Sequence, residues 1–282
     1  MSRVAVVGAG TMGNGIAHVF AQHGWDTALI DVSEDALARG LATIKKNLER
    51  MERKGAISHQ QSADTLGRIT TSTSLEAAKD AELVVEAVSE NPDIKFEVFA
   101  ALRRLTPPET ILASNTSSIS ITELAKRTDR PGKVIGMHFM NPVPVMKLVE
   151  VIRGLETSSN TVARTEEIVR ELEKTPVVVN DAPGFVTNRV LMPMINEAIL
   201  CVQEGIATAE AVDQVMTLGM KHPLGPLALA DLIGLDVCLA ILNVMVEGFA
   251  DPKYRPARLL KEMVASGRLG RKSGVGFYVY RD

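Results

Sequence analysis

Short apolar, β-branched runs alternate with longer amphipathic segments along roughly the first 180 residues. The runs predict strands at residues 4–7, 28–30, 83–88, 110–113 and 134–139. Segments between them place apolar residues three and four positions apart, as in Ile94, Val98, Ala101, Leu102 and Leu105. Alternation of strands and helices predicts an α/β fold, a Rossmann-type doubly wound parallel sheet with helices on both faces.

One helical segment differs from the others in its charge. Residues 33–54 follow a helical pattern and carry many charged side chains, and residues 58–66 could pair with them as a helical hairpin. We expect a charged helical excursion near residues 33–68 that projects from the body of the domain.

The pattern changes in the second half of the chain. Residues 146–152 and 176–180 still read as strands, but from Phe185 onward helical spacing dominates. Between the two patterns lies Asp181-Ala182-Pro183-Gly184, a compact breaker. The sequence therefore predicts a Rossmann-type domain at residues 1–182 and an all-α domain at residues 183–282.

Residues 224–250 are strongly apolar and could be mistaken for a membrane span. Asp231, Asp236 and Glu247 interrupt them, and Gly225, Pro226 and Gly234 fall inside. Charge at bilayer depth is costly, so we expect a buried core helix and no membrane association.

Composition narrows the classes of function. The formal net charge of -3 gives no global field for nucleic acid or an anionic membrane, so anionic ligands need local positive groups. Two cysteines, Cys201 and Cys238, form neither a disulfide framework nor a metal cluster. The chain starts Met1-Ser2-Arg3 and enters a strand at once, which leaves no room for a signal peptide. We expect buried thiols, no metal and a cytoplasmic location.

The first predicted strand runs into a glycine-rich turn that opens a helix. The turn is Gly8-Ala9-Gly10-Thr11-Met12-Gly13, which matches the dinucleotide fingerprint G-x-G-x-x-G in its required context. Gly8 allows the tight turn, Gly10 lets a pyrophosphate approach the backbone, and Gly13 lets the helix lie close to the strand. Free N–H groups at the helix N-terminus then favour a pyrophosphate.

An acid at the end of the second strand indicates which dinucleotide binds. Asp31 can accept both ribose hydroxyls and would repel a 2′-phosphate, and the next residues contain no Arg or Lys. NAD is therefore favoured over NADP. FAD uses the same fingerprint but usually needs more chain to cover the flavin.

Two segments carry candidate chemistry. Residues 114–118, Ser-Asn-Thr-Ser-Ser, follow the strand at 110–113, and they could either contact a ligand or cap the next helix. His138 ends an apolar strand, where a histidine is more often a satisfied core residue. If the chain returns as a hairpin, Glu150 falls near His138, and the pair forms a carboxylate-oriented general base. Alternatively, Glu150 points outward from an edge strand.

These motifs, in this order, resemble the 3-hydroxyacyl-CoA dehydrogenases. The resemblance rests on the glycine fingerprint, Asn115-Thr116-Ser117-Ser118, Met137-His138-Phe139-Met140-Asn141-Pro142, Leu148-Val149-Glu150-Val151 and Pro183-Gly184-Phe185-Val186-Thr187-Asn188-Arg189. It covers nearly the whole chain, to Gly274-Val275-Gly276-Phe277-Tyr278. It implies NAD-dependent interconversion of (S)-3-hydroxyacyl-CoA and 3-oxoacyl-CoA, with the short bacterial form the better match.

The resemblance also implies roles for individual residues. His138 is the expected general base, Glu150 its orienting carboxylate, and Ser117 and Asn188 the groups on the C3 oxygen. Asn115, Glu90 and Lys95 fall where the family contacts the nicotinamide half of the cofactor, and Thr11, Met12 and Asn141 complete the expected cofactor site. Arg50 and Lys54 lie on the excursion where the family contacts CoA, although most charges there are expected to be merely solvated.

Two other classes of function share parts of this pattern. A dehydrogenase for free hydroxy or sugar acids would need a cation beside His138, for which Lys147 is the candidate. A non-catalytic NADH-binding protein would have lost His138, Glu150, Ser117 or Asn188, and all four are present. The apolar stripes of the helical domain exceed what about 100 residues need to bury, so we also expect a homodimer through that domain.

Overall fold

The computed structural model describes residues 2–280, which divide into two compact units, up to Ala182 and from Pro183 onward. The first contains an eight-stranded sheet in the order β3-β2-β1-β4-β5-β6-β7-β8. Its strands are β1 (Arg3–Val7), β2 (Asp26–Ile30), β3 (Ile69–Ser72), β4 (Leu83–Glu86), β5 (Ile111–Ser114), β6 (Val134–Phe139), β7 (Leu148–Arg153) and β8 (Thr175–Asn180).

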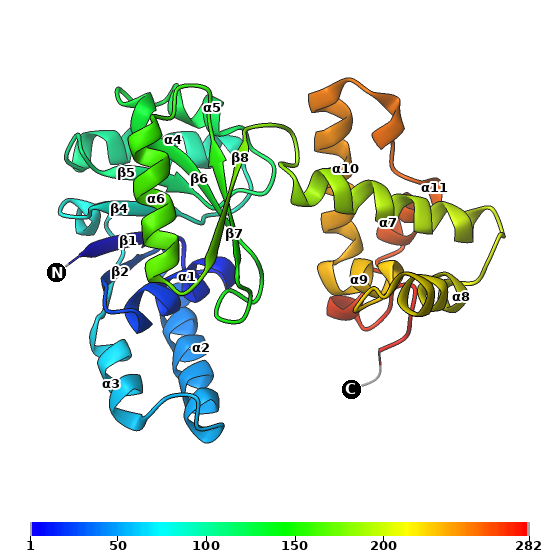
Figure 1. Ribbon diagram of the computed structural model, residues 1–282, viewed down its shortest axis with the longest axis horizontal. Coiled ribbons are helices and arrows are strands. Elements are labelled where there is room, and N and C mark those ends of the chain that lie inside the picture. Colours follow the sequence, from blue (N-terminus) through cyan, green and yellow to red (C-terminus); the bar gives the residue numbers. More distant parts are fainter. Residues whose placement is uncertain (1, 281–282) are drawn as a thin grey trace. The chain divides into compact units, whose positions relative to one another are not determined.

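Helices connect and cover these strands (Figure 1). They are α1 (Thr11–Gln22), α2 (Glu34–Arg53), α3 (His59–Gly67), α4 (Pro92–Leu105), α5 (Ile121–Ala125) and α6 (Ser159–Glu171), with 3₁₀ turns η1 (Leu75–Ala78) and η2 (Pro131–Lys133). All strand pairs are parallel except β6 with β7, which is antiparallel. The predicted Rossmann-type α/β class is confirmed.

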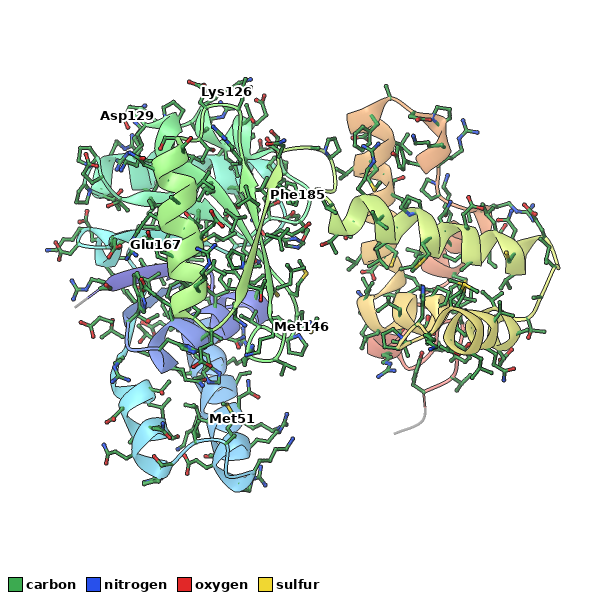
Figure 2. All side chains as sticks on the ribbon, viewed as in Figure 1. Met51, Lys126, Asp129, Met146, Glu167 and Phe185 are labelled. Carbon is green, nitrogen blue, oxygen red and sulfur yellow. The ribbon has the colours of Figure 1, made fainter. Side chains whose placement is uncertain are left out.

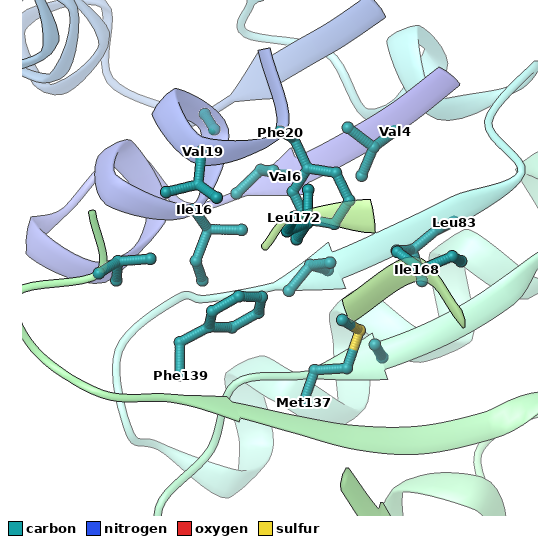
Figure 3. Packing of buried hydrophobic residues seen from close by; sticks show 14 of the residues in the cluster. Val4, Val6, Ile16, Val19, Phe20, Leu83, Met137, Phe139, Ile168 and Leu172 are labelled. Atoms are coloured by element: carbon teal, nitrogen blue, oxygen red, sulfur yellow. The ribbon is translucent and has the colours of Figure 1, made fainter. Parts of the chain in front are cut away.

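Strand periodicity decides which side chains enter the core. Met137 and Phe139 of β6 pack in a cluster with Ile16, Phe20 and Leu172, from α1 and the end of α6 (Figure 3). Successive residues of a strand point to opposite faces, so the residue between Met137 and Phe139 must face the other side of the sheet. That residue is His138.

The charged excursion forms the helix pair α2–α3. Ser33 caps the start of α2, and Ser58 begins α3 with a capping box. The pair extends away from the sheet in Figure 1, and Met51 lies near its far end (Figure 2). Strand β3, which follows it, was missed in the sequence because Ile69-Thr70-Thr71-Ser72 has only one apolar residue.

The second unit is helical. It comprises α7 (Thr187–Gln203), α8 (Ala209–Gln214), a π-helical turn η3 (Val215–Gly219), α9 (Pro226–Ile233), α10 (Leu235–Phe249), η4 (Pro252–Tyr254), α11 (Arg258–Ala265) and η5 (Arg271–Ser273). Its core gathers residues such as Met192, Ile195, Leu227 and Leu242 from three of these helices.

Two expectations about this unit were wrong in detail. The apolar stretch 224–250 is two helices, because Gly234 breaks it with φ of 105° and α9 and α10 meet at 96°. Among the described residues no single helix has the length and apolarity to cross a membrane, although this bent pair meets the two criteria together. Cys238 is buried as expected, but Cys201 is only half-buried.

Candidate active site

The carboxyl ends of four neighbouring parallel strands bring the candidate residues to one edge of the first unit's sheet. β1 leads into the glycine turn, β4 into the segment with Glu90, β5 into the Ser117 loop and β6 into Asn141. Chain order reverses between β1 and β4, and ligands of open α/β sheets bind at such a switch point.

The glycine turn has the shape that a pyrophosphate requires. Gly8 has φ of +105°, and a Cβ on Gly13 would lie 1.7 Å from the Gly8 carbonyl oxygen. Beside Gly10, in contrast, a Cβ would meet no atom within 4 Å. The turn therefore excludes side chains where helix and strand pack, and leaves open space where the helix N-terminus faces outward.

Asp31 is part of the same turn. Its Oδ2 accepts a hydrogen bond from the Ala9 N–H at 2.8 Å and its Oδ1 accepts one from the Ser33 N–H at 3.0 Å. Each carboxylate oxygen keeps a second lone pair. The residues present thus fit NAD: the turn can hold the pyrophosphate, and Asp31 can accept from the adenosine ribose.

His138 and Glu150 are directly opposite each other in the antiparallel pair β6–β7. Glu150 Oε2 lies 2.7 Å from His138 Nδ1, and the two side chains are only 3% and 9% exposed. Because β8 pairs with the other side of β7, Glu150 is not on an edge strand, which removes the alternative interpretation of this acid. A carboxylate can only accept, so Nδ1 carries the proton and the lone pair of Nε2 points away from Glu150.

Ser117 completes this row of groups. Its Oγ lies 3.1 Å from His138 Nε2. Asn115, in the same loop, accepts a hydrogen bond on Oδ1 from the Phe139 N–H at 2.9 Å, which ties the loop to the end of β6. The loop is therefore more than a cap for α5, whose N-cap is Ser120.

Glu90 and Lys95 lie behind the Ser117 loop. Glu90 Oε1 accepts from the backbone N–H groups of Ser117 and Ser118 at 2.9 and 3.1 Å. The Lys95 side chain is 1% exposed, and its Nζ lies 2.7 Å from Glu86 Oε1 and 3.3 Å from Glu90 Oε2. The ammonium group is therefore surrounded by protein oxygens at a depth that the sequence did not indicate.

Glu86 was missed in the sequence. It is the last residue of β4 and is fully buried. The signal was available, because an acid inside the apolar run 83–88 is the same feature that singled out Glu150.

The other predicted residues belong to the loop after β6, to the far end of α2 and to the second unit. Asn141 is exposed in the loop after β6, and Arg50 and Lys54 are exposed at the far end of α2. Asn188 belongs to the second unit, where it is the second residue of α7 and its N–H donates to the Gly184 carbonyl. Lys147 is exposed, and its Nζ donates to the Glu173 carbonyl at 3.3 Å. Among the described residues, no group of three or more His, Cys, Asp or Glu side chains could hold a metal ion.

The site combines a glycine-rich dinucleotide turn, an acid placed to bind the ribose, and an imidazole paired with a carboxylate. This combination defines the class of nicotinamide-dependent dehydrogenases. Family comparison identifies the branch. The NAD binding domain of 3-hydroxyacyl-CoA dehydrogenase matches residues 3–182, and the C-terminal domain of the same family matches residues 184–280. The chain therefore belongs to the 3-hydroxyacyl-CoA dehydrogenase family, and its cofactor is NAD.

Individual relatives agree with this placement. The chain is 54% identical to a probable 3-hydroxybutyryl-CoA dehydrogenase of Bacillus subtilis (strain 168), over 100% of this chain and 98% of that protein. The crystal structure of (S)-3-hydroxybutyryl-CoA dehydrogenase PaaH1 from Ralstonia eutropha superposes with a TM-score of 0.97 at 50% identity, and 100% of both chains is covered. A 3-hydroxyadipyl-CoA dehydrogenase of Escherichia coli (strain K12) is 42% identical over 99% of this chain and 59% of that protein.

Proposed function

We propose that this enzyme oxidises (S)-3-hydroxyacyl-CoA to 3-oxoacyl-CoA and catalyses the reverse reaction, with short acyl chains such as 3-hydroxybutyryl-CoA as substrates. The observation that carries the proposal is the continuous row of Glu150 Oε2, His138 and Ser117 Oγ, with contacts of 2.7 and 3.1 Å. The names of the relatives at 54% and 50% identity support a C4 substrate.

His138 is the general base of this proposal. As the C3 hydroxyl loses its proton, the O–H bond breaks and an N–H bond forms at Nε2 of the imidazole. Glu150, 2.7 Å from Nδ1, stabilises the imidazolium that results. The hydride leaves C3 as the C=O bond forms, and the nicotinamide ring, when bound, supplies the acceptor. In the reverse direction the protonated His138 donates the proton.

Ser117 and Asn188 are proposed to hold the C3 oxygen. Negative charge grows on that oxygen in the transition state for reduction, and fixed donors around it lower the barrier. Ser117 Oγ already lies 3.1 Å from His138 Nε2, the nitrogen that exchanges the proton. The C3 oxygen of the substrate can therefore contact Ser117 and His138 at the same time. Asn188, at the beginning of α7, is proposed as the second donor to this oxygen.

The CoA moiety is assigned to the far end of α2. Arg50 and Lys54 are exposed there and form no salt bridge within residues 2–280, so both cations are available for phosphates. A protein of net charge -3 needs such local cations to hold a polyanionic ligand.

The direct test is oxidation of NADH with acetoacetyl-CoA, with free acetoacetate and NADPH as alternative reactants. Turnover that requires the CoA ester and NADH, and in reverse consumes the (S) but not the (R) hydroxy ester, supports the proposal. Equal turnover of free acetoacetate would refute the acyl-CoA assignment. His138→Gln should retain NADH binding and lose at least about 10²-fold in kcat.

We also propose that the enzyme is a cytoplasmic homodimer that associates through the helical unit. Leu232 of α9 and Val237 of α10 are 52% and 39% exposed, and Val215 and Leu218 of η3 are 63% and 81% exposed. Large apolar side chains that gather in one exposed surface are usually covered by a partner, and these four are proposed to belong to such a surface. The free thiols of Cys201 and Cys238 fit a reducing compartment. Sedimentation at low concentration should give twice the 30.4 kDa chain mass, and a monomer would contradict the assembly.

A further inference from the structure

Two carboxylates share one buried ammonium group behind the Ser117 loop. Glu86 is fully buried, and its Oε1 accepts from Lys95 Nζ and from the Val88 N–H, each at 2.7 Å. Its Oε2 accepts from the Ser114 hydroxyl at 2.6 Å. A buried charge persists only where it is paired and hydrogen-bonded, and Glu86 meets both conditions.

Glu90 joins this pair to the loop. One of its oxygens, Oε2, lies 3.3 Å from Lys95 Nζ, and the other accepts from Thr116, Ser117 and Ser118. The pKa of the Glu90 carboxyl is lowered: burial opposes this shift, but the charge of Lys95 and the hydrogen bonds from the loop outweigh it. One oxygen of the Glu90 carboxylate thus contacts the Lys95 ammonium group, and the other contacts the Ser117 loop.

We propose that Glu86 is a positioning residue for the reaction: it holds Lys95 so that Glu90 keeps the Ser117 loop in place against His138. The Glu86 carboxylate is fully buried and accepts from Lys95, Val88 and Ser114, so it acts on the loop through its neighbours. The inference rests on the proposed role of Ser117 as a donor to the C3 oxygen.

Electrostatics explains why the charge of Glu86 affects the position of Glu90. With Glu86 ionised, Lys95 divides its charge between two carboxylates at 2.7 and 3.3 Å. In Glu86→Gln the neighbour is neutral, so Lys95 should draw Glu90 towards itself and away from the N–H groups of Ser117 and Ser118. The glutamine amide still reaches the Ser114 hydroxyl, so the strand contacts survive while the charge balance changes.

The chain of contacts from Glu86 through Lys95 and Glu90 to the Ser117 loop is called the clamp below. Hydrogen exchange of the Ser117 and Ser118 amides tests this clamp without reference to catalysis. Both amides donate to Glu90 Oε1, so Glu86→Gln should accelerate their exchange in the holoenzyme with NAD. The control is Asp213→Asn, a carboxylate of the helical unit that is 8% exposed and accepts from the Leu227 and Ala228 N–H groups. Asp213→Asn should lower the melting temperature but leave the exchange of the loop amides unchanged.

A double-mutant cycle tests the kinetic consequence. Glu86→Gln alone should lower kcat by between about tenfold and a hundredfold. In a Ser117→Ala background the same substitution should have almost no further effect, because its target is already gone.

The outcomes separate the two hypotheses. Unchanged amide exchange in Glu86→Gln refutes the clamp. If exchange is accelerated but the losses in kcat of Glu86→Gln and Ser117→Ala multiply in the double variant, Glu86 does not act through Ser117. If Ser117→Ala alone keeps full kcat, the proposed role of Ser117 fails and so does any kinetic role for Glu86, while the exchange result still decides whether the clamp exists.

Discussion

The pairing of His138 with Glu150 makes the sharpest prediction of the structure. Glu150→Gln keeps the size of the side chain and its place opposite His138 in β7. It replaces an oxygen that can only accept with an amide that can also donate. If the amide N–H₂ turns towards Nδ1, the imidazole proton must move to Nε2, where it blocks proton abstraction.

The magnitude follows from two effects. The contact of 2.7 Å joins two side chains that are 3% and 9% exposed, so the hydrogen bond is charge-assisted and poorly screened. Loss of such a bond to the imidazolium costs about 1.5–3 kcal/mol, or roughly 10- to 150-fold in kcat. A reversed tautomer adds to this, and in the serine protease triad the equivalent change costs about 10⁴-fold. We expect kcat to fall between about 10² and 10⁴-fold.

Steady-state oxidation of NADH by acetoacetyl-CoA measures this effect, with NADH binding followed separately by fluorescence. The Kd for NADH should stay close to that of the wild type, because Glu150 is 2% exposed and is paired with His138 across β6 and β7. His138→Gln and the double variant with Glu150→Gln provide the control. Once the base is removed, Glu150→Gln should lower kcat little further. An undiminished kcat in Glu150→Gln would refute the idea that this carboxylate orients the base.

Three further predictions concern other parts of the chain. Lys54→Glu should raise KM for acetoacetyl-CoA more than for NADH, and equal effects would refute the CoA assignment of the α2 end. Gly13→Ala should destabilise the protein by at least about 2 kcal/mol and abolish NADH binding, because its Cβ would lie 1.7 Å from the Gly8 carbonyl oxygen; calorimetry with NADH titration measures both, and wild-type binding would contradict the geometry. Burial lowers the pKa of His18 from 6.5 to about 4, so the unfolded chain binds the proton more tightly between these values. Stability should therefore fall by about 3 kcal/mol as the pH drops from 6.5 towards 4, and urea titrations of His18→Gln should show a flatter dependence over that window.

Much of the fold followed from local pattern. Strand β6 was predicted to the residue, because a run of apolar side chains buried on both faces has a simple signature. The glycine turn and Asp31 were recognisable for a similar reason, since their requirements are local: a positive φ, a close approach of helix and strand, and an acid at the end of the next strand. The break at Gly234 was not, because a glycine in an apolar stretch does not indicate whether the helix bends or continues.

The site depended on how distant segments meet. The sequence indicated that Glu150 could approach His138 only if the two strands paired, and the antiparallel register of β6 and β7 settled the distance at 2.7 Å. Nothing in the order of residues linked Glu86 to Ser117, because the link passes through a lysine on α4 and a carboxylate in the preceding loop. Residue types and local geometry are determined within a few positions of the chain. The sharing of one ammonium group by two carboxylates depends instead on packing between a strand, a helix and a loop. Only the folded sheet brings these three segments together.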